Sequence, residues 1–274
     1  GEYRGLLEAL LAVETYIEQI REDYVVIMPG NLAVNLDLAA MLKEHIASGA
    51  GITAAVTNRV PNGEHHRYIV DENGTVEQTL YRRKGEGPGV VDMEVYMMEK
   101  SVLLEMIDRA AAEMRYRFHA DGIAGFLERG GVMHIYRHSG YTMQINSSQD
   151  YLEANMDMLK RENRRSLFPV DRPVLTKDRA DVSTYYGENA HVRNSLISDG
   201  CYIEGTVENC VIAPGVHIGK GSVLRNCIIM RDSRIGDDVQ LHYVVSDKNI
   251  CVRDGQQLMG SETVPVVIPR GVTA

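Results

Sequence analysis

Five basic side chains lie in one short stretch of the chain and form its densest group of residues able to bind an anion. They are Lys160, Arg161, Arg164, Arg165 and Arg172. Guanidinium groups make paired hydrogen bonds to phosphate oxygens, so this composition is typical of a site for a phosphorylated ligand. The alternative is a solvated helix end, where basic residues interact favourably with the helix dipole. The residues alone leave both interpretations open.

A second candidate site is the segment Pro29-Gly30-Asn31, which follows the apolar segment Tyr24 to Met28. Ligands of open α/β sheets bind beyond the carboxyl ends of the strands. If residues 24–28 form a buried strand, Asn31 lies where a ligand is expected.

Two pairs of histidines are close enough in the sequence to be considered as metal ligands. His134 and His138 are four residues apart, as in helical zinc sites, but Val132 to His138 has the pattern of a strand, which favours a packed or solvated pair. His65 and His66 follow Pro61-Asn62-Gly63, and we expect them at a loop tip. No metal site is therefore predicted from the histidines.

The elements that position these residues follow an α/β pattern before residue 165. Short apolar segments alternate with amphipathic ones, which is typical of a mostly parallel, Rossmann-like sheet. Asn35 is the expected N-cap of a helix that ends near Ser48-Gly49, and Asp71 to Gly74 is a strong hairpin turn. Ser147 to Asp150 has the pattern of a capping box before a helix. The further expected elements are a helical face over Leu6 to Ile20, strands over 52–57, 68–70, 76–80 and 90–98, and helices from Ser101 and over Tyr151 to Lys160.

The last third of the chain repeats itself. One apolar column runs through Val192, Val207, Leu224 and Leu241, and a second runs through Ile203, Ile218, Ile235 and Val252; both have steps of 15, 17 and 17 residues. A coil of this length cannot bury its own apolar face, so neighbouring coils must stack into a solenoid. The pattern resembles the hexapeptide repeat of left-handed parallel β-helices, with Asn, Gly and Asp at the corners.

Composition restricts the class of protein. The net charge of −9 argues against nucleic acid or an anionic membrane as the main partner, because both need a basic surface. All four cysteines lie in the repeat region, and Cys210 and Cys227 share the register of Ser195. We interpret them as small side chains stacked inside the solenoid, in a reducing, cytoplasmic setting.

The order of domains and several short motifs resemble one family. The motifs are Tyr3-Arg4-Gly5, the run Glu153-Ala-Asn-Met-Asp157 and the repeat that opens at Asn194. The chain is similar over nearly its whole length to glucose-1-phosphate adenylyltransferase, which makes ADP-glucose from ATP and glucose 1-phosphate for glycogen biosynthesis. The resemblance also implies a Gly-rich ATP loop with an Arg upstream of Tyr3, which this sequence does not include.

Both positions that hold magnesium in active relatives differ here. The resemblance aligns Asn31 with the Asp of a Ser-Gly-Asp-His motif, and Gln144 with the Asp of a Trp-Arg-Asp-Val-Gly motif. An amide lacks the anionic oxygen that a hard divalent cation favours beside phosphate. We therefore expect no catalytic residues and no cofactor for this chain, although catalytic relatives use Mg²⁺.

The sugar-phosphate pocket of the family also differs. Tyr81 and Arg82 align with its Glu-Lys-Pro motif, and Asp92 and Glu94 lie within the counterpart of its Ser-Met-Gly-Ile-Tyr motif. The two carboxylates would oppose a phosphate in a low-dielectric cleft. The full set of pocket counterparts is Tyr81, Arg82, Asp92, Glu94, Tyr96, Phe118 and Asp121.

These changes on an otherwise intact chain resemble the regulatory, GlgD-type subunit of the family. The expectation is a catalytically weak or inactive subunit that assembles with a catalytic homologue, as a tetramer, or with itself. The alternative is an active nucleotidyltransferase with altered metal ligands. The five basic residues named above are candidates for binding a phosphorylated effector. The expected organisation is a truncated nucleotidyltransferase-like domain over 1–165, a linker over 166–181 and a left-handed β-helix over 182–274.

Overall fold

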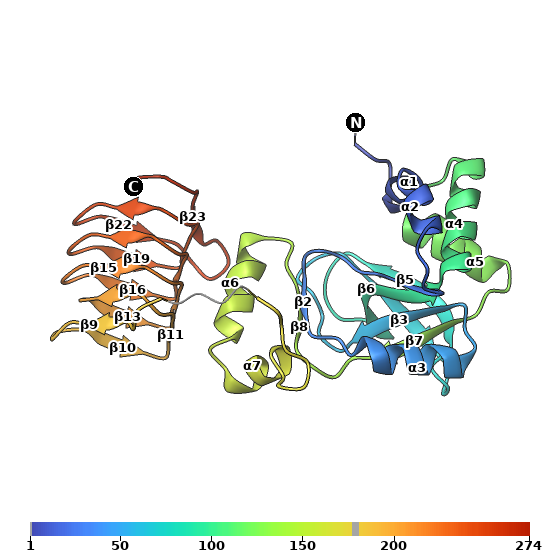
Figure 1. Ribbon diagram of the computed structural model, residues 1–274, viewed down its shortest axis with the longest axis horizontal. Helices are drawn as coiled ribbons and strands as arrows, with labels where there is room; N and C mark the ends of the chain where they lie inside the picture. Colours follow the sequence, from blue (N-terminus) through green and yellow to red (C-terminus); the bar gives the residue numbers. More distant parts are fainter. Residues whose placement is uncertain (1, 177–180) are drawn as a thin grey trace. The chain divides into compact units, whose positions relative to one another are not determined.

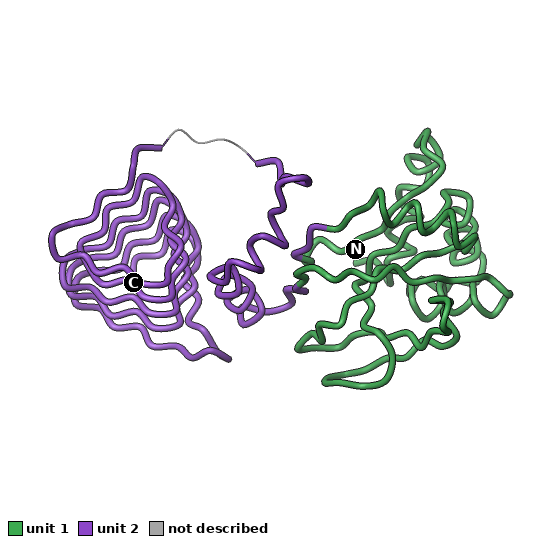
Figure 2. The backbone as a smooth tube through the Cα atoms, turned by 90° about the horizontal axis from the view of Figure 1, so that it is seen from below, with its two compact units in different colours: residues 1–32, 36–142 green, residues 33–35, 143–274 purple. Residues whose placement is uncertain are grey.

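The computed structural model describes residues 2–176 and 181–274; residues 177–180 of the expected linker lie outside the described part. The chain divides into two compact units, coloured separately in Figure 2. Unit 1 runs to residue 32 and from 36 to 142, and unit 2 comprises 33–35 and 143–274. This division falls before the residue 165 expected from the sequence, because the helices that follow residue 147 belong with the β-helix.

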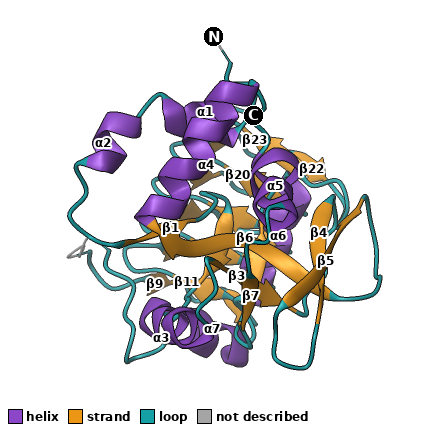
Figure 3. Ribbon diagram, turned by 90° about the vertical axis from the view of Figure 1, so that its right-hand side faces the viewer, coloured by secondary structure: helices purple, strands orange, loops and turns teal. Residues whose placement is uncertain are grey.

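Unit 1 is a mixed sheet with helices on both faces (Figure 3). Its strands are β1 (Tyr24–Ile27), β3 (Ile52–Thr57), β4 (His65–Val70), β5 (Val76–Arg82), β6 (Val90–Glu99) and β7 (Met133–Arg137). Its helices are α1 (Leu6–Leu11), α2 (Glu14–Glu18), α3 (Leu38–Ser48), α4 (Lys100–Glu113), the π-helical turn η1 (Phe118–Ile123) and α5 (Ala124–Glu128). Figures 1 and 3 place α3 on one side of the sheet and α1 and α4 on the other. The expected face over Leu6 to Ile20 is thus split between α1 and α2, with Leu7 and Ile17 in the core.

The long strand β6 is the centre of the sheet. One of its edges pairs with β3, and the other pairs with β4 near its start and with β1 near its end. These pairings are antiparallel, as is β4 with β5, and β3 with β7 is parallel. The expectation of a mostly parallel sheet was therefore wrong for the described strands. β4 and β5 are joined by the short turn at Asp71 to Gly74, and a connection that short joins antiparallel strands, because a parallel pair requires a crossover of a dozen or more residues.

The helix signals in the sequence were correct in kind but not always in position. α3 ends at Gly49, whose φ of 63° is left-handed, as expected for a glycine C-cap. Its N-cap is Asp37, whose carboxylate accepts from Ala40 N at 2.9 Å. The expected cap, Asn35, instead donates its amide to the carbonyls of Leu167 (3.0 Å) and Arg172 (2.9 Å). That assignment was wrong because the side chain is used in long-range contacts.

Unit 2 contains a left-handed parallel β-helix of three five-stranded sheets (Figure 1). The first sheet contains β9 (Tyr185–Tyr186), β12 (Tyr202–Ile203), β15 (His217–Ile218), β18 (Arg234–Ile235) and β21 (Cys251–Val252). The second contains β10 (His191–Arg193), β13 (Thr206–Glu208), β16 (Val223–Arg225), β19 (Gln240–His242) and β22 (Gln257–Met259). The third contains β11 (Leu196–Ile197), β14 (Val211–Ile212), β17 (Ile228–Ile229), β20 (Val244–Ser246) and β23 (Val266–Ile268).

Strand pairing in the β-helix confirms the register predicted from the repeat. Val207 pairs with Leu224, and Ile218 pairs with Ile235. Ile203, Ile218 and Val207 are at most 1% exposed, so they form the interior. The corner between the first and second sheets is two residues shorter after Ile203 than after Ile218. Gly205 makes the short corner possible, because a Cβ there would lie 2.4 Å from the carbonyl oxygen of Ser222.

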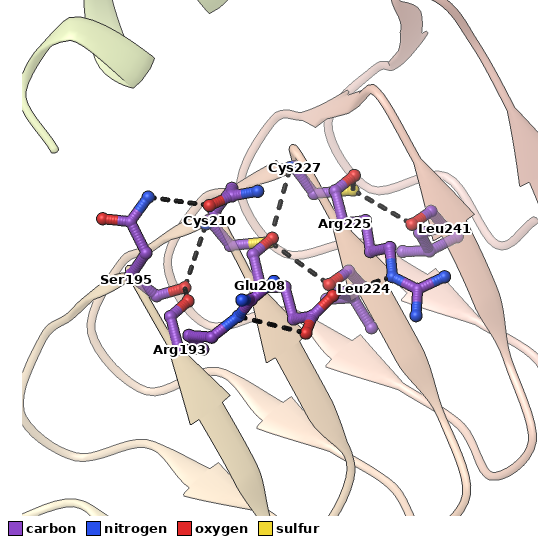
Figure 4. Close-up of polar contacts among 10 residues, drawn as sticks. Arg193, Ser195, Glu208, Cys210, Leu224, Arg225, Cys227 and Leu241 are labelled. Carbon is purple, nitrogen blue, oxygen red and sulfur yellow. Dashed lines mark hydrogen bonds and ion pairs between the residues drawn. The ribbon is translucent and has the colours of Figure 1, made fainter.

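A column of small side chains fills the interior beside the second sheet (Figure 4). Cys210 N donates to Ser195 Oγ (3.0 Å), and Cys227 N donates to Cys210 Sγ (3.4 Å). All four thiols are free, and burial raises the pKa of the Cys210 thiol well above its ordinary value. Outside the same coils, Glu208 accepts from Arg225 at 2.9 Å and lies 3.4 Å from Arg193. The predicted stacking of Ser195, Cys210 and Cys227 is confirmed.

Two helices complete unit 2. α6 (Ser148–Asp157) begins at the predicted cap, where Ser147 Oγ accepts from Asp150 N at 3.1 Å, and α7 (Arg161–Leu167) follows. Leu152 of α6 packs with Ile228 and Val245 on the outer face of the third sheet. β2 (Leu32–Val34) and β8 (Thr142–Gln144) form a separate two-stranded sheet. Among the described residues, no helix has both the length and the apolar character needed to cross a membrane.

Candidate functional site

The carboxylate of Asp92, on β6, is the centre of a polar cluster buried in unit 1. Its side chain has no exposed surface. Its Oδ2 accepts from the Tyr68 hydroxyl at 2.8 Å and from the Tyr96 hydroxyl, and its Oδ1 accepts from Glu94 N at 2.9 Å. Burial, and next the charge of Asp92, raise the pKa of both tyrosines well above the ordinary value. Both hydroxyls therefore stay protonated and act as donors to the carboxylate.

His119 adds a further donor to the same oxygen. Its Nε2 lies 3.0 Å from Asp92 Oδ2 and 2.5 Å from the Tyr96 hydroxyl. The residue lies in the π-helical turn η1, next to Phe118, whose ring centroid is 5.0 Å from that of Tyr96. Since Oδ2 also accepts from two tyrosines, this oxygen is saturated by the protein's own groups and has little capacity left to bind a ligand.

A stacked pair of imidazoles covers this cluster. The rings of His66, on β4, and His119 have centroids 3.6 Å apart and an interplanar angle of 2°. Tyr81 is half exposed and contacts the His66 ring, with the two ring centroids 5.3 Å apart. Burial, followed by the charge that His119 can carry, lowers the pKa of His66 to about 4. His66 is thus neutral near neutral pH.

A β-bulge places Asp92 toward the interior. β6 pairs with β3 through Val95 opposite Ala55 and Asp92 opposite Val56, so Met93 and Glu94 are additional residues in β6. Glu94 has a φ of 59°, a left-handed conformation that costs a residue with a Cβ about 1–2 kcal/mol. The resemblance aligns Glu94 with the glycine of Ser-Met-Gly-Ile-Tyr, and the backbone here keeps the conformation that suits glycine.

Three cationic or basic side chains occupy the opposite face of the β4–β5 hairpin. Successive residues of a strand point to opposite faces, so His65 and Arg67 face away from His66 and Tyr68. Arg82 pairs with His65 across the hairpin and lies on the same face. Arg67 is 7% exposed and donates to the carbonyls of Pro88 (3.0 Å) and Gly89 (2.6 Å). His65 Nε2, Arg67 Nη1 and Arg82 Nε are buried without hydrogen-bond partners. The unpaired guanidinium N–H groups of Arg67 and Arg82 are buried donors that favour an anion, whereas His65 already donates through Nδ1 to the carbonyl of Gly63 at 2.9 Å.

The positions that align with the family's magnesium ligands do not fit a magnesium site. Asn31 lies in unit 1 between β1 and β2, Gln144 ends β8 in unit 2, and each is half-buried. Their amide oxygens are neutral, whereas magnesium favours carboxylate ligands. Within 2–176 and 181–274, there is also no group of three or more His, Cys, Asp or Glu residues placed to hold a metal ion.

The structure brings together only part of the predicted pocket. Asp92, Tyr96 and Phe118 are in the buried cluster, and Tyr81 reaches it through His66. Asp121 is used locally, because its Oδ2 accepts from the backbone N of Arg117 at 2.9 Å. His134 and His138 are held by carbonyls of Asn73 and Tyr141 and do not share a helix.

Four of the five basic residues proposed for an effector lie at the start of α7 or within it, and three of the five make contacts of their own. Lys160 Nζ pairs with Asp157 Oδ1 at 3.0 Å, and Arg164 donates to the carbonyl of Met158. Arg172 donates to Asn35 Oδ1 at 3.2 Å, whereas Arg161 and Arg165 are exposed. Arg164 and Arg165 lie in the last turn of α7, where they also complement the helix dipole.

Sequence reasoning missed several members of the buried clusters. His65 and His66 were expected at a loop tip, which is wrong: β4 begins at His65, which is 3% exposed. The hairpin turn alone could not have predicted this contact: counting outward from Asp71 to Gly74 pairs His66 with Thr79, whereas a register shift between Ile69 and Val70 places His66 opposite Tyr81. The resemblance aligns Phe118 and Asp121 with an Asp-Phe-Gly-x-Asp segment, so His119 takes the place of its glycine, and this substitution could have marked the position.

Comparison with known proteins identifies the family. The sequence profile described as "Nucleotidyl transferase" matches residues 1–161, which is more than half of the chain. This chain belongs to the nucleotidyl transferase family. Residues 181–263 match the profile described as "GlmU-like, C-terminal hexapeptide", in agreement with the β-helix.

Relatives of this nucleotidyl transferase chain carry the name glucose-1-phosphate adenylyltransferase. The protein from Acetivibrio thermocellus is 28% identical over 96% of this chain and 63% of its own length. Those from Desulfitobacterium hafniense strain Y51 and Bacillus thuringiensis strain Al Hakam are each 27% identical, over 92% and 97% of this chain and 64% and 72% of their own lengths. The chain therefore spans about two thirds of the length of these relatives.

Proposed function

We propose that this chain is a regulatory subunit of glucose-1-phosphate adenylyltransferase, catalytically weak or inactive by itself, in a cytoplasmic hetero-oligomer with a catalytic homologue that supplies ADP-glucose for glycogen biosynthesis. The observation that carries the proposal is the state of Asp92. Its carboxylate accepts from Tyr68, Tyr96, His119 and Glu94 N, so the pocket counterpart is filled by the protein's own side chains.

The metal positions support the same conclusion. Asn31 and Gln144 replace both carboxylates that the resemblance assigns to magnesium, which removes the charge that a phosphoryl-transfer metal needs. An intact fold with these changes suits a subunit that contributes to the assembly through its surface and not through catalysis. Such a subunit would act by stabilising one state of its catalytic partner, which is an allosteric effect on a population.

The test measures ADP-glucose formation from ATP and glucose 1-phosphate by three samples: the full-length protein alone, the catalytic homologue alone, and both together. We expect no turnover by this chain alone, and a changed rate or effector response for the pair. Arg164→Ala with Arg165→Ala tests the effector residues, with Arg253→Ala, an exposed arginine of the β-helix, as the control. Turnover by this chain alone that Asn31→Ala or Gln144→Ala abolishes would overturn the proposal.

A second function, an active sugar-phosphate nucleotidyltransferase with altered ligands, is favoured by one observation. Arg67 and Arg82 keep buried guanidinium nitrogen atoms without partners, which suits a bound phosphoryl group. If this function is correct, Arg82→Met abolishes turnover by the chain alone. The regulatory proposal predicts that there is no such turnover to abolish.

A further inference from the structure

A polar cleft within unit 2 separates α6 from one corner of the β-helix. Its volume is about 580 Å³. Gln149, Glu153 and Asp157 line it from α6, and Asn209 and Asn226 line it from the corner between the second and third sheets. None of these side chains belongs to the Asp92 cluster of unit 1. The cleft is therefore separate from the site described above.

The corner carries a column of asparagines, one in each of three successive coils. Asn194, Asn209 and Asn226 have φ values of 45°, 50° and 53°, and Asn194 Nδ2 donates to Asn209 Oδ1 at 2.7 Å. Glycine serves the same backbone conformation elsewhere in the β-helix, as at Gly200 and Gly215. The left-handed turn therefore does not by itself require an amide. The column adds donors and acceptors at about 4.8 Å intervals, the spacing of neighbouring strands.

The base of the cleft is apolar. Leu152 and Met156 of α6 and Tyr243 of the corner line it and also pack in the cluster that joins α6 to the third sheet. Pockets for small organic ligands commonly combine an apolar surface with a few converging polar groups. This cleft has that composition.

The charges in the cleft oppose a phosphorylated ligand. Among the described residues that line it, the one cation, Lys160, pairs with Asp157 at 3.0 Å, and the other charged residues, Glu153 and Glu262, are acidic. A phosphate would meet like charge. Amide groups instead both donate to and accept from hydroxyls, and carboxylates accept from them. We propose that this cleft binds a neutral polyhydroxylated ligand, a sugar, independently of the function proposed for the unit 1 site.

The asparagine column allows a matched test. Asn209→Gly together with Asn226→Gly removes two amides while keeping residues suited to positive φ. The control is Asn249→Gly, which makes the same change at a φ of 58° on a corner outside the cleft. Gln149→Ala is an independent variant that changes the α6 wall at a helical position. Circular dichroism melting verifies that each variant is folded.

The measurement is binding of maltose and of glucose 1-phosphate to the full chain, by saturation-transfer NMR and calorimetry. We expect wild type and Asn249→Gly to bind maltose. Gln149→Ala and the double glycine variant should each weaken the affinity for maltose about fivefold or more, the effect of roughly one lost hydrogen bond. The proposal is overturned if wild type does not bind maltose, if all variants bind alike, or if glucose 1-phosphate binds the cleft in preference.

Discussion

Acid should destabilise unit 1 through His66, and this effect can be isolated with one substitution. The His66 ring lies against His119, next to the Asp92 carboxylate and His65, with Tyr81 at its edge. Its pKa is lowered to about 4, first by burial and then by His119. In the unfolded chain an ordinary histidine titrates near 6.5. Between these two pH values His66 is therefore protonated in the unfolded state but neutral in the folded state.

The sign and size of the effect follow from this difference. Between pH 6.5 and 4 the unfolded state binds more protons, so the free energy of unfolding falls as the pH falls through this window. A shift from 6.5 to about 4 corresponds to about 3.4 kcal/mol at 1.36 kcal/mol per pH unit. His66 is only half-buried, and solvent screening reduces this to about 1–2 kcal/mol. The contribution is complete above pH 6.5 and is lost progressively toward pH 4.

The assay compares wild type with His66→Gln at pH 7 and pH 5. Native-state hydrogen exchange of β4 and β6 amides reports the stability of unit 1, and an NMR titration gives the pKa of His66 directly. We expect wild type to lose about 1 kcal/mol more than the variant between the two pH values. His191→Gln, at an exposed histidine on β10, is the matched control. Equal losses in wild type and His66→Gln, or a His66 midpoint near 6.5, would refute the reasoning.

Three further predictions concern local structure and can be measured by thermal or urea unfolding. Glu94→Gly should be more stable than Glu94→Ala by about 1 kcal/mol, because only glycine adopts the φ of 59° without strain; equal stabilities would contradict this account of the bulge. Ser147→Ala should cost about 1 kcal/mol through loss of the α6 cap, whereas Ser148→Ala, one residue later, should cost less. Ile218→Ala should cost about 2–5 kcal/mol, since its side chain is 1% exposed inside the β-helix; a cost below that of exposed Val267→Ala would argue against the interior assignment.

The β-helix could be predicted from the sequence almost residue by residue. Each coil repeats one backbone path, so the spacing of Val207, Leu224 and their counterparts determines which residues pair and which face inward. Local signals were similarly reliable where the side chain acts nearby, as at Ser147 and at the Asp71 to Gly74 turn. They failed at Asn35, whose amide binds carbonyls more than 130 residues away.

The sequence predicted several residues of the candidate site but not how their side chains are arranged. The resemblance singled out Asp92, Tyr96 and Phe118, and these side chains do meet. The inward orientation of the Asp92 carboxylate depends on His119 in η1 and on Tyr68 in β4, which only the packed sheet brings to the same oxygen. Strand direction was missed for a related reason, because the periodicity of one strand carries no information about its neighbour.

The two lengths of the corner between the first and second sheets indicate where the β-helix tolerates insertion and deletion. The chain takes five residues to pass from Ile218 to Leu224 and only three from Ile203 to Val207, yet the strands on either side stay in register. A two-residue change at this corner therefore leaves the interior columns aligned. Loop grafts or peptide tags should be accommodated there, whereas the same insertion within a strand would shift every inward side chain that follows in that coil.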